Sequence, residues 1–157
     1  MDWAALFSVA NTYVLLPWAA LILLPRGPGL HALVFYLGIG LLSLAYAILL
    51  VLLFGGFVDP VRDAGLAEPA MFDFSLAGVM DLFRSEGGVT LGWIHYLAFD
   101  LFVGQWIAKD GDHKGVSRIV QGPILFLTLM AGPLGLLIWM AVRERAARAV
   151  AGNGKRG

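Results

Sequence analysis

The residues of this chain that could do chemistry lie in one apolar run, from Gly88 to Ala108. The run is long enough to cross a membrane, yet it contains His95, Tyr96 and Asp100. At a rise of about 1.5 Å per residue, His95 and Asp100 both lie within roughly 5 Å of its centre. An ionisable side chain at that depth costs at least about 2.5–3.5 kcal/mol. We therefore expect both residues to serve in chemistry or to pair with neighbouring helices.

Helical periodicity separates these residues into two stripes. At about 100° per residue, Tyr96 and Asp100 share one face, and Trp93 lies at its edge. His95 begins another stripe, which continues through Phe99, Phe102 and Trp106. His95 and Asp100 are about 140° apart, so we do not expect them to bond to each other. Each should face a different helix, or the opposite walls of one cavity.

Each polar residue of the run has a structural alternative. Asp100 could transfer a proton, or it could be a neutral carboxyl that bonds to Asn11 or Tyr96 and fixes the helix packing. His95 could be a satisfied core histidine, a proton-transfer group or a ligand of metal or haem. The aromatic stripe could be core, lipid-facing surface or a groove for a long conjugated ligand. Polar side chains of the other apolar runs, such as Asn11 and Thr128, could join them in one layer across the bundle.

Composition assigns the chain to a class and excludes several functions. Hydrophobic residues make up 59% and charged residues 14%, where a soluble domain has about a quarter charged, so we expect an integral membrane protein. There is no cysteine, which excludes disulfides and thiolate metal sites. The net charge of zero argues against a nucleic-acid partner. Haem held between helices usually needs two intramembrane histidines, and only His95 qualifies, so we expect no metal and no cofactor.

Apolar run lengths predict an all-α membrane domain, a four-transmembrane-helix bundle with a short interfacial amphipathic helix between spans two and three. That amphipathic helix could brace the bundle or cover a lipophilic substrate. One domain over 1–150 and a disordered basic tail over 151–157 are expected. Four spans put both termini on one side, and the positive-inside rule then favours the cytoplasm, at a bacterial inner membrane. The predicted spans are 3–24, 31–54, 88–108 and 119–142, and the amphipathic helix is 73–84.

The third run also resembles a known family. The pattern W-x-H-x-x-x-x-D-L-F from Trp93 to Phe102, followed by Asp110-Gly111 as a turn, is similar to the abscisic-acid-deficient-four family of plants and its bacterial relatives. The resemblance extends to the four-span layout and to an amino-terminal helix that contains Asn11. Plant members are associated with forming neoxanthin from violaxanthin, the isomerisation of a xanthophyll epoxide to an allene. Such a reaction needs an acid and a base and no redox cofactor.

The resemblance implies a carotenoid- or isoprenoid-modifying membrane protein, with cofactor-free isomerisation as the reaction. His95, Asp100 and Tyr96 are then the candidate catalytic residues. The expected partners are a lipophilic small molecule and membrane lipid, with a second copy or a partner enzyme left open. The alternatives are a non-catalytic pigment- or lipid-binding subunit and a small proton-coupled carrier that uses Asp100. Candidate substrate-binding residues are Asn11, Trp93, Phe99, Phe102 and Trp106.

Overall fold

The computed structural model describes residues 1–62 and 73–153, and most of these residues are helical. Within those ranges there is no β-strand, and one isolated bridge joins Arg62 to Ser85. The all-α prediction is therefore confirmed. The division into a domain over 1–150 and a tail over 151–157 stays a prediction, because residues 154–157 lie outside the described part of the chain.

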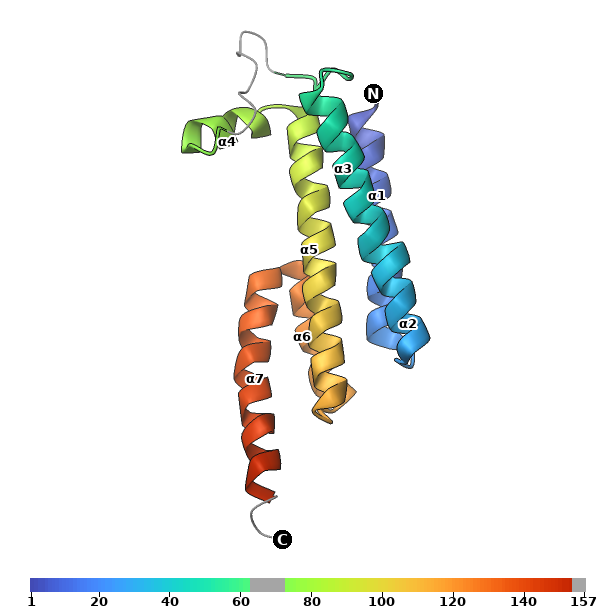
Figure 1. Cartoon of the computed structure of the whole chain (residues 1–157), viewed down its shortest axis with the longest axis vertical. Helices are drawn as coiled ribbons and strands as arrows, with labels where there is room; N and C mark the ends of the chain where they lie inside the picture. Colours follow the sequence, from blue (N-terminus) through green and yellow to red (C-terminus); the bar gives the residue numbers. More distant parts are fainter. Residues whose placement is uncertain (63–72, 154–157) are drawn as a thin grey trace.

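The first half of the chain forms two long antiparallel helical rods (Figure 1). Asp2 caps the first by accepting a hydrogen bond from the Ala5 amide. The second rod is continuous through a π-helical segment, η1. In the described residues these two rods are the helices long and apolar enough to cross a membrane. The elements are α1 (Trp3–Leu23), then α2 (Pro28–Leu33), η1 (Val34–Gly40) and α3 (Leu41–Phe54), close to the predicted 3–24 and 31–54.

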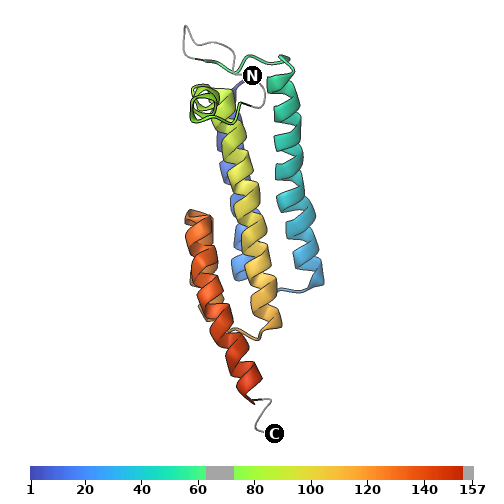
Figure 2. The same ribbon diagram turned by 60° about the vertical axis from the view of Figure 1, so that its left-hand side comes forward.

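The central helix, α5 (Glu86–His113), packs against both rods (Figure 2). It begins where the Ser85 hydroxyl accepts a hydrogen bond from the Gly88 amide at 3.0 Å. Close approach to α1 depends on a glycine, because a Cβ at Gly104 would overlap the ring of Trp18. The helix is longer than the predicted 88–108.

The extra length of α5 corrects one expectation. Asp110 and Gly111 were expected to form a turn, but they lie inside the helix, which continues to His113. The backbone amides of residues 109–113 still donate to helical carbonyls, so the helix does not end there. The polar residues of this segment mark the end of the apolar run and not the end of the helix. The connection to the next helix is confined to residues 114–117.

A short helix, α4 (Leu76–Phe83), lies across the end of α5 (Figure 1). Ser75 caps it, since its hydroxyl accepts a hydrogen bond from the Gly78 amide at 3.1 Å. The predicted amphipathic helix over 73–84 is therefore present over most of its length. Hydrophobic spacing also predicts Phe72 on the apolar face of this helix, and that residue lies outside the described part of the chain.

The predicted fourth helix over 119–142 is wrong, because the chain reverses in its middle. It forms a hairpin of α6 (Arg118–Met130) and α7 (Gly132–Asn153), which turns at Ala131, whose backbone is not helical (φ −155°, ψ 76°). Pro133 lacks an amide hydrogen and cannot continue the hydrogen bonding of α6, but it is tolerated in the first turn of a new helix. Gly132-Pro133 therefore starts a second helix where one continuous helix was predicted.

The hairpin also changes where the chain ends. The start of α1 and the end of α7 lie at opposite ends of the long axis (Figures 1 and 2). The expectation that both termini lie on one side required a continuous fourth helix, which the structure does not have.

Candidate functional site

His95 lies in an aromatic stack between α3 and α5. Its ring lies 4.5 Å from the ring of Phe99, nearly parallel at 19°, and 5.4 Å from the ring of Tyr46. The His95 side chain is exposed, and Phe99 is 59% exposed. An exposed imidazole held between two rings is accessible to a ligand and has a fixed orientation. His95 is therefore not a buried core histidine.

Tyr96, one residue later, belongs to a second stack that faces α1. Trp93 lies between the rings of Phe7, at 5.5 Å, and Tyr96, at 5.2 Å. The indole Nε1 of Trp93 donates a hydrogen bond to Asn11 Oδ1 at 2.9 Å, and the Asn11 amide donates to the Phe7 carbonyl. Asn11 therefore orients Trp93 and does not bond to Asp100.

Asp100 is buried beneath the turn of the α6–α7 hairpin. It is 8% exposed, and its Oδ1 lies so close to the backbone of Gly132 that a Cβ there would overlap it. The nearest polar groups are the Tyr96 hydroxyl and the Gly132 backbone, and Tyr96 also donates to the Met130 carbonyl at 3.4 Å. Within the described residues, Asp100 Oδ2 is buried without a hydrogen-bond partner.

The structure thus puts His95 and Asp100 in different surroundings. His95 faces α3, whereas Asp100 faces the start of α7. This matches the expected separation of the two residues around the helix. The expected polar layer does not form as one connected network. The Thr128 hydroxyl donates to the Ile124 carbonyl of its own helix, and Asn11 accepts a hydrogen bond from Trp93.

The remaining two residues of the aromatic stripe lie on the outer face of α5. Phe102 and Trp106 are both exposed, and the Arg143 guanidinium lies 5.6 Å from the centre of the Trp106 ring. They follow His95 and Phe99 along the helix towards its carboxyl end. The stripe is therefore an open aromatic track with a cation at its far end.

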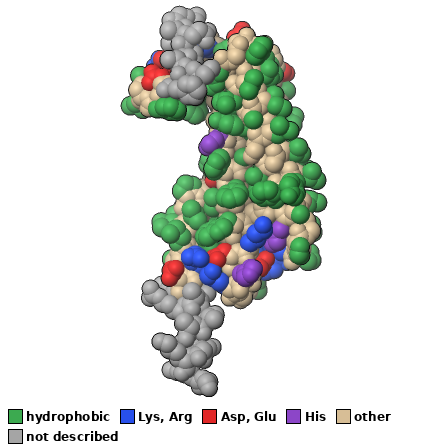
Figure 3. All heavy atoms as spheres, viewed as in Figure 1, with side chains coloured by type: hydrophobic (Ala, Val, Ile, Leu, Met, Phe, Trp, Pro, Cys, Tyr) green, Lys and Arg blue, Asp and Glu red, His purple; other side chains and the backbone are tan. Residues whose placement is uncertain are grey.

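An apolar cavity of about 700 Å³ lies above this track, between α3, α4 and α5. Figure 3 shows the molecule hollowed between α4 and the α6–α7 hairpin. Tyr46 belongs both to the cavity wall and to the His95 stack, so the two features are continuous. Sequence reasoning missed the cavity, because only the position of α4 brings its lining residues together. These include Tyr46, Leu50, Phe54, Val79, Phe83 and Leu91.

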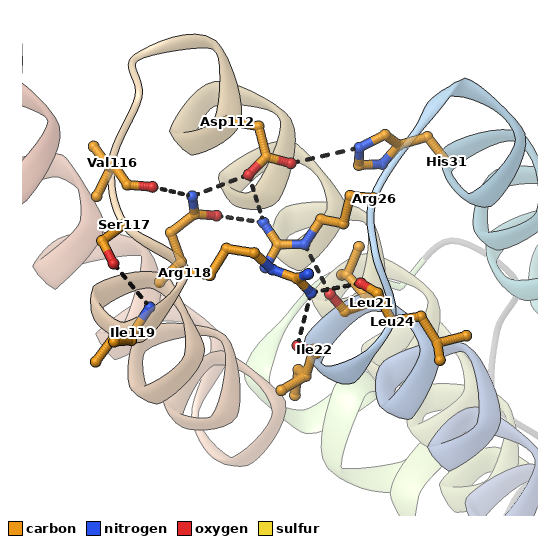
Figure 4. A network of polar contacts seen from close by, with 11 residues as sticks. Leu21, Ile22, Leu24, Arg26, His31, Asp112, Val116, Ser117, Arg118 and Ile119 are labelled. Atoms are coloured by element: carbon orange, nitrogen blue, oxygen red, sulfur yellow. Dashed lines mark hydrogen bonds and ion pairs between the residues drawn. The ribbon is translucent and has the colours of Figure 1, made fainter.

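Two polar clusters at the far end of α5 were also missed. In the first, Arg26 contacts the Asp112 carboxylate at 3.0 Å and the Gln121 amide oxygen at 2.5 Å (Figure 4). In the second, Asp110 accepts hydrogen bonds from Arg143 at 2.8 Å and Lys114 at 2.5 Å. The only available signal was the i, i+4 spacing of Asp110 and Lys114. Among the described residues, no group of three or more histidine, aspartate or glutamate side chains could hold a metal ion.

Comparison of the sequence with known protein families identifies a family to which the chain is related. The sequence pattern of the ABA DEFICIENT 4-like family matches residues 5–139, which is most of the chain. The chain belongs to the ABA DEFICIENT 4-like family. Its match includes all the candidate site residues on α1 and α5 and the hairpin turn, and the family's association with neoxanthin synthesis supports a carotenoid-related role. No curated protein and no solved structure matches the chain significantly.

Proposed function

We propose that this ABA DEFICIENT 4-like protein crosses the membrane three times, through α1, the α2–η1–α3 rod and α5. The two rods have the length and apolar character that crossing requires, and the 28 residues of α5 rise about 42 Å. The 13 residues of α6 rise only about 20 Å, less than the roughly 30 Å of hydrocarbon. The α6–α7 hairpin therefore enters the bilayer from one side and turns back near its middle.

Charge supports an orientation for this arrangement. Basic described side chains collect at the end that contains the α1–α2 and α5–α6 connections, namely Arg26, Lys109, Lys114, Arg118 and Arg143. The other end has Arg62 and Arg84 among mostly acidic residues. The positive-inside rule then puts the basic end, with the end of α7, in the cytoplasm, and the start of α1 on the opposite side.

The ligand that this surface fits is a carotenoid or another long isoprenoid. The cavity beneath α4 falls within the 300–1,000 Å³ of small-molecule sites and is lined mainly by apolar side chains. A polyene chain is longer than such a cavity. One end group would occupy the cavity, and the chain would lie along the exposed aromatic track of Phe99, Phe102 and Trp106.

The reaction that these residues could serve is a cofactor-free isomerisation. Opening an epoxide to an allenic alcohol breaks one C–O bond, adds a proton to the oxygen and removes a proton from a nearby carbon. His95, at the edge of the cavity, could accept the carbon-bound proton. Tyr96 and Asp100 face α1 and the hairpin turn, so supplying the proton to the oxygen would require the substrate to reach around α5 to them. The observation that carries the proposal is the exposed His95 imidazole beside Tyr46, at the edge of the cavity.

A non-catalytic pigment- or lipid-binding subunit is the second candidate. It is favoured by the packing of Asp100 beneath Gly132, since a carboxyl enclosed by the hairpin turn can hold two helices together without touching a ligand. In that case the aromatic track would bind the pigment or lipid, and Asp100 would contribute to the stability of the fold.

Pigment chromatography on a carotenoid-producing bacterial host separates these candidates. The chain is expressed unchanged and as His95→Gln, Asp100→Asn, Phe99→Ala and, as a surface control, Asp81→Asn. An isomerase yields a new peak of unchanged mass, which His95→Gln lowers by about 100-fold or more while the control does not. All variants must remain in the membrane at equal amounts.

The other outcomes are equally informative. A new peak of changed mass keeps an enzyme but discards isomerisation. An unchanged pigment profile with pigment bound to the purified protein, reduced by Phe99→Ala, supports the binding subunit. An unchanged profile with no bound pigment contradicts both candidates.

A further inference from the structure

A second groove, of about 640 Å³, lies at the basic end of the molecule. It is formed by the α1–α2 connection, the first turns of the second rod and the last turns of α5. Figure 3 shows basic, acidic and histidine side chains gathered at this end. The groove is separate from the apolar cavity beneath α4. Its lining includes Arg26, His31, Phe35, Tyr36, Lys109 and His113.

One wall of the groove is a rigid polar frame. The Arg26 side chain is 2% exposed and contacts Asp112, the Gln121 amide oxygen and, through Nε, the Leu21 carbonyl (Figure 4). Asp112 Oδ1 accepts from Arg26, and Oδ2 lies 3.9 Å from His31 Nε2. Arg26 thus neutralises the Asp112 carboxylate, which would otherwise repel an anion.

Unused hydrogen-bonding capacity remains in that frame. Within residues 1–62 and 73–153, Arg26 Nη2 and His31 Nδ1 are buried without a hydrogen-bond partner. Buried polar atoms in native proteins are almost always paired, so unpaired ones indicate a missing partner. A guanidinium needs an acceptor, and an imidazole can donate to one.

Positive charge exceeds negative charge around the groove. Lys109 is exposed, and among the described residues it forms no hydrogen bond or ion pair. Arg26 and Lys109 both act electrostatically on His31, and Arg118 acts on Arg26. Burial lowers the pKa of Arg26, Asp112 opposes that shift, and Arg118 adds to it. Cations that repel one another in a partly enclosed groove attract an anion.

The open edge of the groove is aromatic. Phe35 and Tyr36 line it, and Tyr36 is 68% exposed. One side of the groove is therefore cationic and the other apolar. That combination fits an anion attached to an apolar body, at the depth where headgroups meet hydrocarbon.

We propose that this groove binds a phosphate group, with the Lys109 ammonium as its direct contact and Arg26 and His31 as the supporting frame. The phosphate could belong to the headgroup of an anionic lipid or be free in solution. The site is independent of the isomerase proposal. The lipid source rests on the proposed membrane placement, whereas binding of free phosphate does not.

The test measures binding by calorimetry to the full-length protein in neutral detergent. The probes are short-chain phosphatidylglycerol, short-chain phosphatidylcholine and inorganic phosphate. The variants are Lys109→Gln and, as a matched control, Lys114→Gln, whose ammonium pairs with Asp110 and does not line the groove. We expect saturable phosphatidylglycerol binding that Lys109→Gln weakens about tenfold, the size of one charge-assisted hydrogen bond. Lys114→Gln should change it less than about twofold.

The probes separate the two sources. Binding of phosphatidylglycerol without inorganic phosphate identifies a lipid headgroup site, and binding of both, each weakened by Lys109→Gln, identifies a general phosphate site. Binding of neither probe, or equal weakening by the two lysine variants, overturns the proposal. Equal binding of phosphatidylcholine would also overturn it as a site for anionic groups.

Discussion

Two aspartates of the same helix show how surroundings decide the role of a carboxyl group. Asp100 lies beneath Gly132, and one of its oxygens lacks a partner in the described part of the chain. Asp110, less than three turns later, accepts hydrogen bonds from Arg143, Lys114 and the Trp139 indole. Asp110 is thus an electrostatic anchor between α5 and α7, and Asp100 is the residue with unused capacity.

The anchor should make stability depend on pH. The hydrogen bond from Arg143, followed by that from Lys114, lowers the pKa of Asp110 to about 2, although burial opposes them. A lowered folded-state pKa adds stability above the unfolded value near 3.9, and this stability is lost as pH falls through about 2. We expect Arg143→Gln to lower the Tm at pH 6, and the difference from wild type to shrink as pH falls from about 4 towards 2.

Thermal unfolding in detergent at several pH values measures this effect. Arg84→Gln is the control, because it removes an exposed pair with Asp81 at 3.3 Å that should contribute little. A Tm difference between wild type and Arg143→Gln that is constant across this pH range would show that Arg143 acts through its packing on Trp106 and not through Asp110.

At the residue scale, the sequence predicted angular positions but not partners. The separation of His95 from Asp100 follows from helical geometry alone, and the structure agrees. The bond between Asn11 and Trp93, and the pairing of Asp110 with Arg143, connect residues 82 and 33 positions apart. Such pairs depend on which helices become neighbours, and a single sequence does not contain that information.

At the scale of elements, the hairpin turn is the feature that shapes the candidate site. The α6–α7 hairpin packs along α5 only as far as Tyr96, whose hydroxyl donates a hydrogen bond to the Met130 carbonyl. Beyond that level α4 is the one described element that covers this side of α5, and the cavity lies there. Hydropathy could not reveal the turn, because the residues on both sides of Ala131 are equally apolar.

The fit of the hairpin against α5 can be tested with glycines. Gly132→Ala adds a Cβ that overlaps the Asp100 carboxyl, so we expect the free energy of unfolding to fall by about 1–3 kcal/mol. Gly122→Ala, in α6, adds the same atom where nothing lies within 4 Å, and it should be neutral or slightly stabilising. Thermal unfolding of both variants measures the contrast. Equal effects would mean that the hairpin does not pack tightly on Asp100.

At the scale of the whole molecule, most described charges lie at the two ends, and His95 and Asp100 are exceptions in an otherwise apolar middle. Four long apolar helices were predicted, whereas the described residues contain two, because the fourth run is a hairpin and α5 is long but less apolar than the two rods. The all-α class was predicted correctly and the other elements approximately, apart from the turn expected at Asp110-Gly111, since run length and turn residues specify them locally. The topology was not predicted correctly, because it depends on whether Gly132-Pro133 bends a helix or ends it.

The absence of cysteine makes topology directly measurable. Asp81→Cys, in α4, and Glu144→Cys, in α7, put single thiols at exposed positions towards opposite ends. We expect a membrane-impermeant maleimide to label Asp81→Cys in intact cells and Glu144→Cys only after lysis. Labelling of both from the same side would restore a fourth span and contradict the hairpin placement.

The α6–α7 hairpin extends along only part of α5, and this affects how a ligand would reach the protein. In the proposed placement, the hollow between α4 and the hairpin opens sideways into the bilayer and not towards water. A ligand would then arrive by two-dimensional diffusion, and its effective concentration would be its mole fraction among the lipids. Adding inert lipid at a fixed total amount of ligand would slow the reaction by surface dilution, while changing the aqueous volume would not.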